Sequence, residues 1–214
     1  MRIDRITRHC AALLAGCILA VASHAALLDD FVAAAANDRG AELRAMLARG
    51  VDPDTVDANG DPVLVIAARA GALSAVEALL AGKARVDARN RFGDTALMIA
   101  ALNGRLDVAK ALRAAGADVN PRGWTPLAYA ATGGHDDVVA WLLAQGATID
   151  ARSANGTTPL MMAAREGRYA TALLLIDKGA NVNVRNENDM SALDFAQRNN
   201  DERLVARLRA AGAR

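Results

Sequence analysis

Cysteine, histidine and aromatic residues are scarce in this chain of 214 residues. It has 2 cysteines and 3 histidines, and aromatic residues make up 3% of it. So few aromatic residues argue against a β-rich fold. The formal net charge is +1 at pH 7, which gives no bulk attraction to nucleic acid or to an anionic membrane. Hydrophobic residues make up 53%, which is too much for a disordered chain.

Alanine, in contrast, is abundant, with 51 residues. Alanine has the highest helix propensity, and its small side chain lets helices pack closely. The length corresponds to one or two globular domains. The composition therefore predicts an all-α, soluble protein of nearly neutral charge.

The first 25 residues have the pattern of a secretory signal peptide. Three arginines precede an apolar run over residues 11–22, and the small residues Ser23 and Ala25 follow. The run has about 12 residues, whereas a membrane-spanning helix needs about 20. We predict a signal peptide over residues 1–25, cleaved between Ala25 and Ala26, and a periplasmic mature protein. A buried N-terminal helix is the alternative interpretation.

A second processing signal overlaps the first. The segment Leu14-Ala15-Gly16-Cys17 resembles a bacterial lipobox, in which Cys17 would carry the lipid and anchor the protein at the membrane. The apolar run before Cys17 is short and continues beyond it, which favours soluble export over lipidation. Cys10 and Cys17 both lie in the predicted signal, so the soluble mature chain would have no disulfide even in an oxidising compartment.

A period of 33 residues, shortened once to 30, organises the chain after residue 26. Turn positions recur at this interval at Gly50, Lys83, Gly116, Gly146, Gly179 and Gly212. A large apolar residue recurs at Phe31, Leu64, Leu97, Leu127, Leu160 and Leu193. We predict a repeat domain over residues 26–214, with approximate repeats at 27–58, 59–89, 90–120, 121–151, 152–184 and 185–214.

Each repeat has the signals of two helices joined by a turn. A Thr or Ser stands where the first helix would be capped, at Thr95, Thr125, Thr158 and Ser191. Pro126 and Pro159 follow at the first helical position, where a missing N–H group costs nothing. Glycine after the second helix suits a left-handed cap, and Lys83 stands at one such position instead.

These repeats resemble the ankyrin repeat. Three copies carry the resemblance most clearly: DTALMIAALNGRLDVAKALRAAGADVN, WTPLAYAATGGHDDVVAWLLAQGATID and TTPLMMAAREGRYATALLLIDKGANVN. The resemblance covers residues 27–214 and implies an all-α solenoid of about six helix-turn-helix repeats, with β-turn fingers projecting at one edge.

Two departures from the family pattern stand out. The histidine that follows the conserved leucine position in the family motif is replaced in every copy, which removes hydrogen bonds between neighbouring turns. The junction before Thr125 is three residues short, which predicts a truncated finger at Trp124.

The sequence offers little for catalysis. His135 is the one histidine after the predicted signal, so a zinc site would lack its usual ligand set and a Ser-His-Asp triad would have to use His135. His135 and the neighbouring Asp136 and Asp137 are best interpreted as residues of a helix start. We predict no enzyme activity, no metal and no cofactor.

The resemblance implies that contacts come from the finger tips and from the exposed side of the first helices. Arginines outnumber acidic residues at these positions, which predicts an acidic partner surface. Arginine and aromatic residues also dominate the binding energy of protein interfaces. The candidate partner-binding residues are Arg69, Arg89, Arg91, Phe92, Asp94, Asn103, Trp124, Thr132, Arg152, Asn155, Arg165, Glu166, Arg185 and Arg198.

Together these observations predict a monomeric, exported adaptor that binds a periplasmic or envelope protein through its concave finger face. Nucleic acid and a membrane span are not expected. For small exported bacterial members, the resemblance implies a link to protection of periplasmic enzymes such as catalase under oxidative stress. Two alternatives stay open. One is an inhibitor or immunity protein for an effector enzyme, and the other is a small-molecule or envelope-binding module with a pocket at the shortened finger.

Overall fold

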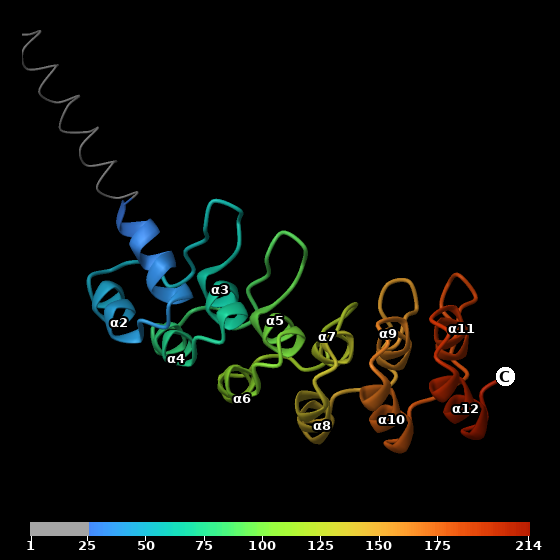
Figure 1. Cartoon of the computed structure of the whole chain (residues 1–214). Coiled ribbons are helices and arrows are strands. Elements are labelled where there is room, and N and C mark those ends of the chain that lie inside the picture. Colours follow the sequence, from blue (N-terminus) through green and yellow to red (C-terminus); the bar gives the residue numbers. More distant parts are fainter. Residues whose placement is uncertain (1–25) are drawn as a thin grey trace, which may run out of the picture.

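Pairs of short helices, each pair joined by a tight turn, build the part of the chain that this computed structural model describes, residues 26–214. Figure 1 shows them as a gently curved stack of two rows, with α3, α5, α7, α9 and α11 in one row and their partners in the other. The helices are residues 26–36, α2 (Gly40–Ala48), α3 (Val63–Ala70), α4 (Leu73–Ala81), α5 (Ala96–Leu102), α6 (Leu106–Ala114), α7 (Pro126–Gly133), α8 (Asp136–Ala144), α9 (Pro159–Arg165), α10 (Tyr169–Asp177), α11 (Ala192–Arg198) and α12 (Glu202–Ala210).

The first helix of four repeats begins at the predicted cap. The hydroxyls of Thr95, Thr125, Thr158 and Ser191 each accept the backbone N–H three residues on, at 3.3 Å. Pro126 and Pro159 occupy the first turn of α7 and α9, as predicted. Side-chain caps of this kind typically stabilise a helix by about 1 kcal/mol. Local sequence therefore sets where these short helices begin.

The core runs through the whole stack. All six residues of the predicted apolar register, from Phe31 to Leu193, are buried, with at most 8% of the side chain exposed. The alanine pairs Ala100-Ala101 and Ala130-Ala131 are fully buried between neighbouring first helices. The constant period places each apolar side chain against its counterpart in the next repeat. Stability therefore comes from interfaces between neighbouring repeats.

His135 joins two repeats from the start of α8. Its Nε2 lies 2.9 Å from the carbonyl oxygen of Leu102 in the preceding repeat. A Cβ atom at Gly104 or Gly133 would lie 2.5 Å from the imidazole ring, so both positions need glycine for this close approach. The predicted packing role of His135 therefore agrees with its position.

Polar side chains also connect neighbouring repeats at the base of the fingers. Asp54, Asp87, Asn120, Asp150 and Asn183 each accept a backbone N–H of the next repeat, at 2.8–3.2 Å. The family histidine is replaced in every copy, but these side-chain oxygens still link the turns of neighbouring repeats.

Lys83 adopts the left-handed backbone conformation that the repeat register predicts. Its φ is 68°, whereas Gly82 before it has a φ of −74°. Asp38, Asp189 and Asn200 are also left-handed, but their short polar side chains tolerate this region better than lysine does.

We expect Lys83→Gly to stabilise the protein by up to about 1 kcal/mol. Relief of the left-handed strain is worth roughly 1–2 kcal/mol, and the greater freedom of glycine in the unfolded chain offsets part of it. Urea denaturation of the two proteins measures the difference. A clear loss of stability in the variant would contradict the strain argument.

The predicted signal peptide and its two processing sites involve residues 1–25 and their junction with Ala26. Residues 1–25, Cys17 and Ala25 among them, lie outside the part of the chain that the structure describes. Among residues 26–214, no helix is both long and apolar enough to cross a membrane. The predicted repeat boundaries stay predictions.

Candidate interaction surface

Finger-like loops project from one edge of the stack before α3, α5, α7, α9 and α11 (Figure 1). Antiparallel backbone bridges close two of them, between Val56 and Pro62 and between Arg89 and Thr95. The loop before α7 is visibly shorter than the others in Figure 1, as the missing residues predict. The fingers and the first helices behind them form one continuous surface.

The finger before α5 presents an aromatic tip. Phe92 is 70% exposed, and the guanidinium of Arg91 stacks over its ring at 4.8 Å from the centroid. The side chain of Asn90 fixes the turn, because its Oδ1 accepts the backbone N–H groups of Phe92 and Asp94 at 2.9 Å. Phe92 and Arg91 are therefore held out to solvent, as predicted for a contact tip.

Trp124 does not form an exposed tip, which corrects the position expected for it. It is half-buried, and its ring packs edge-to-face on Tyr129 of α7, with 6.2 Å between the centroids. The physical reason is the shortened loop, which is too short to carry the indole away from the helices. Trp124 contributes instead to the wall of a hollow on the helix surface.

This hollow has a volume of about 210 Å³ and lies where the short finger leaves the first helices uncovered. It is lined by Leu102 of α5, Trp124, Tyr129 and Thr132 beside and within α7, and Met162 and Arg165 of α9. Its walls are mainly apolar, with one cation at the rim. We call it the central hollow.

Tyr129 ties the central hollow to the neighbouring finger. Its hydroxyl donates a hydrogen bond to the carboxylate of Asp94. Burial, and then Asp94, raises the pKa of Tyr129 well above its ordinary value, so the hydroxyl keeps its proton. Asp94, predicted as a partner contact, is thereby engaged within the protein.

Leu102, Tyr129 and Met162 are absent from the predicted site residues. A signal for two of them was present in the sequence. Tyr129 and Met162 each lie two residues after a buried leucine of the repeat register, at a position where the copies carry Ile66, Ile99, Tyr129, Met162 and Phe195. At this repeat position, Tyr129 and Met162 line the central hollow.

Most of the predicted contact arginines make internal contacts. Arg69 pairs with Asp61 at 2.7 Å, and Arg165 pairs with Glu166 at 2.9 Å. Guanidinium groups of Arg89, Arg152 and Arg185 donate to backbone carbonyls of the fingers, at 2.5–2.7 Å. All five arginines are nevertheless exposed, although Asp61 beneath Arg69 is buried. The exposed pair between Arg165 and Glu166 is worth at most about 1 kcal/mol, so a partner carboxylate can compete for Arg165.

The other predicted residues fall into two groups. Asn103 and Thr132 bond to carbonyls of their own helices, and Asn155 shapes its finger by accepting the Ser153 hydroxyl at 2.6 Å. Arg198 is exposed and makes no ion pair within the part of the chain that the structure describes. The structure thus brings Trp124, Thr132 and Arg165 together at the central hollow.

The acidic pair at the start of α8 is engaged in helix contacts. Asp136 accepts the hydroxyl of Thr171 from the next repeat, and Asp137 accepts the N–H of Val138 at 2.8 Å. Over residues 26–214, no three His, Cys, Asp or Glu side chains cluster closely enough to hold a metal ion.

A comparison with protein-family models identifies ankyrin repeats in three copies, over residues 31–122, 115–186 and 152–214. A search of curated proteins gave no match. Ankyrin repeats indicate a protein–protein interaction module, and members of the family are generally non-catalytic binding scaffolds. Since the matches cover nearly all of the described residues, the chain belongs to the ankyrin repeat family.

Proposed function

We propose that this protein is an exported adaptor that binds a protein partner through its fingers and first helices. The central hollow carries the proposal. Its apolar walls are formed by Trp124 and Tyr129, with Arg165 at the rim, and the exposed Phe92 stands on the finger next to it. Aromatic and arginine side chains that fill or line such hollows supply most of the binding energy in protein interfaces.

The size of the central hollow favours a protein partner over a small molecule. At about 210 Å³ it is smaller than sites for drug-sized ligands, which occupy about 300–1,000 Å³. It suits one large apolar side chain of a partner. The exposed arginines at Arg91, Arg165 and Arg198 favour an acidic surface around that side chain. Association should then slow as salt rises, because exposed charges are screened over about 8 Å at physiological ionic strength.

The proposed location rests on the N-terminal sequence. We expect a soluble periplasmic product that begins at Ala26, and mass spectrometry of the protein isolated from cells decides this. A product that begins with a diacylglyceryl-modified Cys17 would replace soluble export with lipid anchoring.

Crosslinking in the periplasm, followed by co-purification and identification of the partner, tests the binding proposal. Periplasmic enzymes of oxidative-stress defence, such as catalase, are the first class to test, because the family resemblance implies them. A partner whose activity is blocked in the complex would support the inhibitor or immunity alternative. Recovery of a small envelope molecule without any protein would contradict the adaptor.

A further inference from the structure

The two ends of the stack differ in polarity. At the C-terminal end, α12 exposes Glu202, Arg203 and Arg209 and buries its leucines. At the N-terminal end, the finger residue Val56 is 53% exposed, and Leu28 of the helix over residues 26–36 is only partly covered. The terminal repeats of a solenoid need polar outer faces to stay soluble. The N-terminal end therefore carries an apolar surface that its own chain does not cover over residues 26–214.

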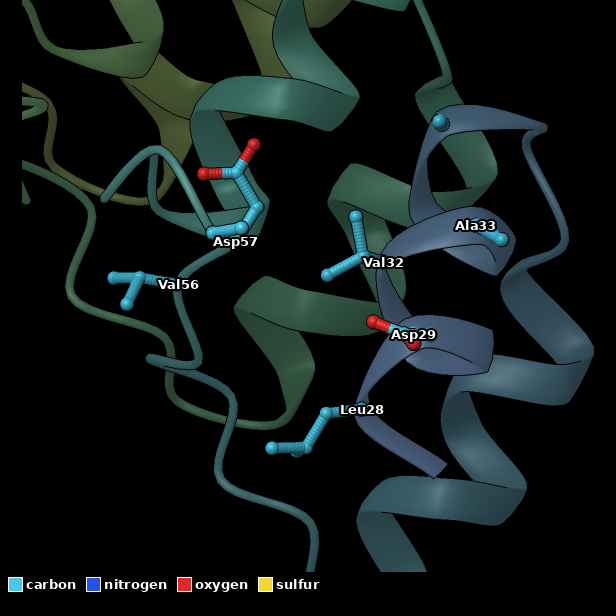
Figure 2. Close-up of a pocket in the computed structure, with 8 residues that line it drawn as sticks. Leu28, Asp29, Val32, Ala33, Val56 and Asp57 are labelled. Carbon is cyan, nitrogen blue, oxygen red and sulfur yellow. The ribbon is translucent and has the colours of Figure 1, made fainter. Parts of the chain in front are cut away.

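This surface is a groove between the helix over residues 26–36 and the first finger. Figure 2 shows Leu28 and Val32 projecting from the helix toward the finger segment that carries Val56 and Asp57. The groove has a volume of about 510 Å³, and a second hollow of about 590 Å³ shares Leu28 and Val56 with it. The two hollows are therefore adjacent and offer more room than a single side chain fills.

The first finger also has unpaired backbone groups. In the last two fingers, Arg152 donates from Nη2 to the carbonyl of Arg185 at 2.7 Å, and the N–H of Glu187 donates to the carbonyl of Asn155 at 3.0 Å. The counterparts of Arg185 and Glu187 four repeats earlier are Val56 and Ala58.

Neither the carbonyl of Val56 nor the N–H of Ala58 has a hydrogen-bond partner among the described residues. The equivalent groups of the next finger, the carbonyl of Arg89 and the N–H of Arg91, are likewise without a partner among the described residues. The first finger differs in that these groups lie beside the apolar groove. Open edges of this kind bind extended segments through main-chain hydrogen bonds.

The charged residues around the groove indicate what kind of segment would bind there. Asp29 and Asp57 line it, and Asp30 is exposed beside it. The second hollow adds Asp52 and Asp54 against one cation, Arg49, so carboxylates outnumber cations over the whole surface. Burial of Asp57 favours its neutral form, but hydrogen bonds from Asp61 and Asn59 outweigh this and lower its pKa, so the carboxylate stays ionised near neutral pH. These carboxylates would repel the same end of a second copy. The arginine donor in the later fingers also indicates a cationic occupant.

We propose that this N-terminal groove is a second docking surface, separate from the fingers and first helices, for an extended segment of a protein partner. The segment carries an arginine or lysine beside a large apolar side chain. The apolar side chain lies against Leu28, Val32 and Val56, and the cation lies among the carboxylates and donates to the carbonyl of Val56. The segment thus binds the first finger in the way that Arg152 and Asn155 bind the last one.

A random 12-residue peptide library, selected on the chain from residue 26 onward, tests this proposal. Clones that also bind Val56→Glu are removed, and a synthetic peptide of the recovered sequence is titrated. We expect a cationic residue beside an apolar one, and an affinity at least about tenfold weaker on Asp29→Lys, a variant that plays no part in the selection. Val56 is exposed, so helicity should be unchanged.

Ala154→Glu, an exposed substitution on the finger before α9, is the matched control and should leave the affinity unchanged. Groove-dependent peptides without a cationic residue, or the absence of any groove-dependent peptide, would overturn the proposal. Sedimentation velocity tests the alternative that a second copy of the chain binds the groove. A dimer that forms with rising concentration and is lost in Val56→Glu would show that another copy of the chain occupies the groove instead.

Discussion

Replacement of Arg91, Phe92 and Trp124 by alanine is expected to weaken binding of the proposed partner by about 4 kcal/mol, roughly a thousandfold in Kd. Truncation of one buried aromatic or arginine anchor typically costs about 2 kcal/mol or more, and such losses are not additive. Phe92 and Arg91 form the exposed tip, and Trp124 forms a wall of the central hollow. Titration of the purified partner measures the loss.

Two controls separate binding from folding. Trp124 packs on Tyr129, so the triple variant is compared with Arg91→Ala/Phe92→Ala, which removes no contact with the helices. A second variant changes Arg113, Lys178 and Arg207 on the second helices. If this second variant loses the partner while the finger variant keeps it, the opposite side of the stack carries the function.

Leu127→Ala is expected to destabilise the protein by about 2–5 kcal/mol. The side chain of Leu127 is fully buried in α7, between α5 and α9 on either side. Its truncation leaves a cavity at the centre of a stack whose stability depends on contacts between neighbours. Urea denaturation followed by circular dichroism measures the loss and shows whether the transition broadens as the two halves separate.

Leu193→Ala is the matched control, because it removes the same atoms from the last repeat. Leu193 is 8% exposed and, within residues 26–214, has a neighbouring repeat on one side only. A smaller loss of stability is expected there, without broadening of the transition. A cost below about 1 kcal/mol for Leu127→Ala would contradict the role of the repeat register in the core.

The sequence by itself determined the repeat register and the starts of four first helices, at Thr95, Thr125, Thr158 and Ser191. Thr125 and Pro126 act through hydrogen bonds and backbone angles within a few residues, so their effect is local and readable. The left-handed Lys83 followed from its place in a period whose other members are glycine. These inferences were possible because the same pattern of residues recurs in successive repeats.

Only the tertiary structure decided which of these residues form a surface. Trp124 turned inward because a shortened loop cannot lift it, and Tyr129 meets Asp94 only when two repeats stack. Of the predicted contact arginines, Arg152 donates to the carbonyl of Arg185 in the next repeat, whereas Arg89 and Arg185 bond within their own fingers. The N-terminal groove likewise depends on how the helix over residues 26–36 packs beside the first finger. Contacts between residues about one repeat apart depend on how the helices pack, which local propensity does not encode.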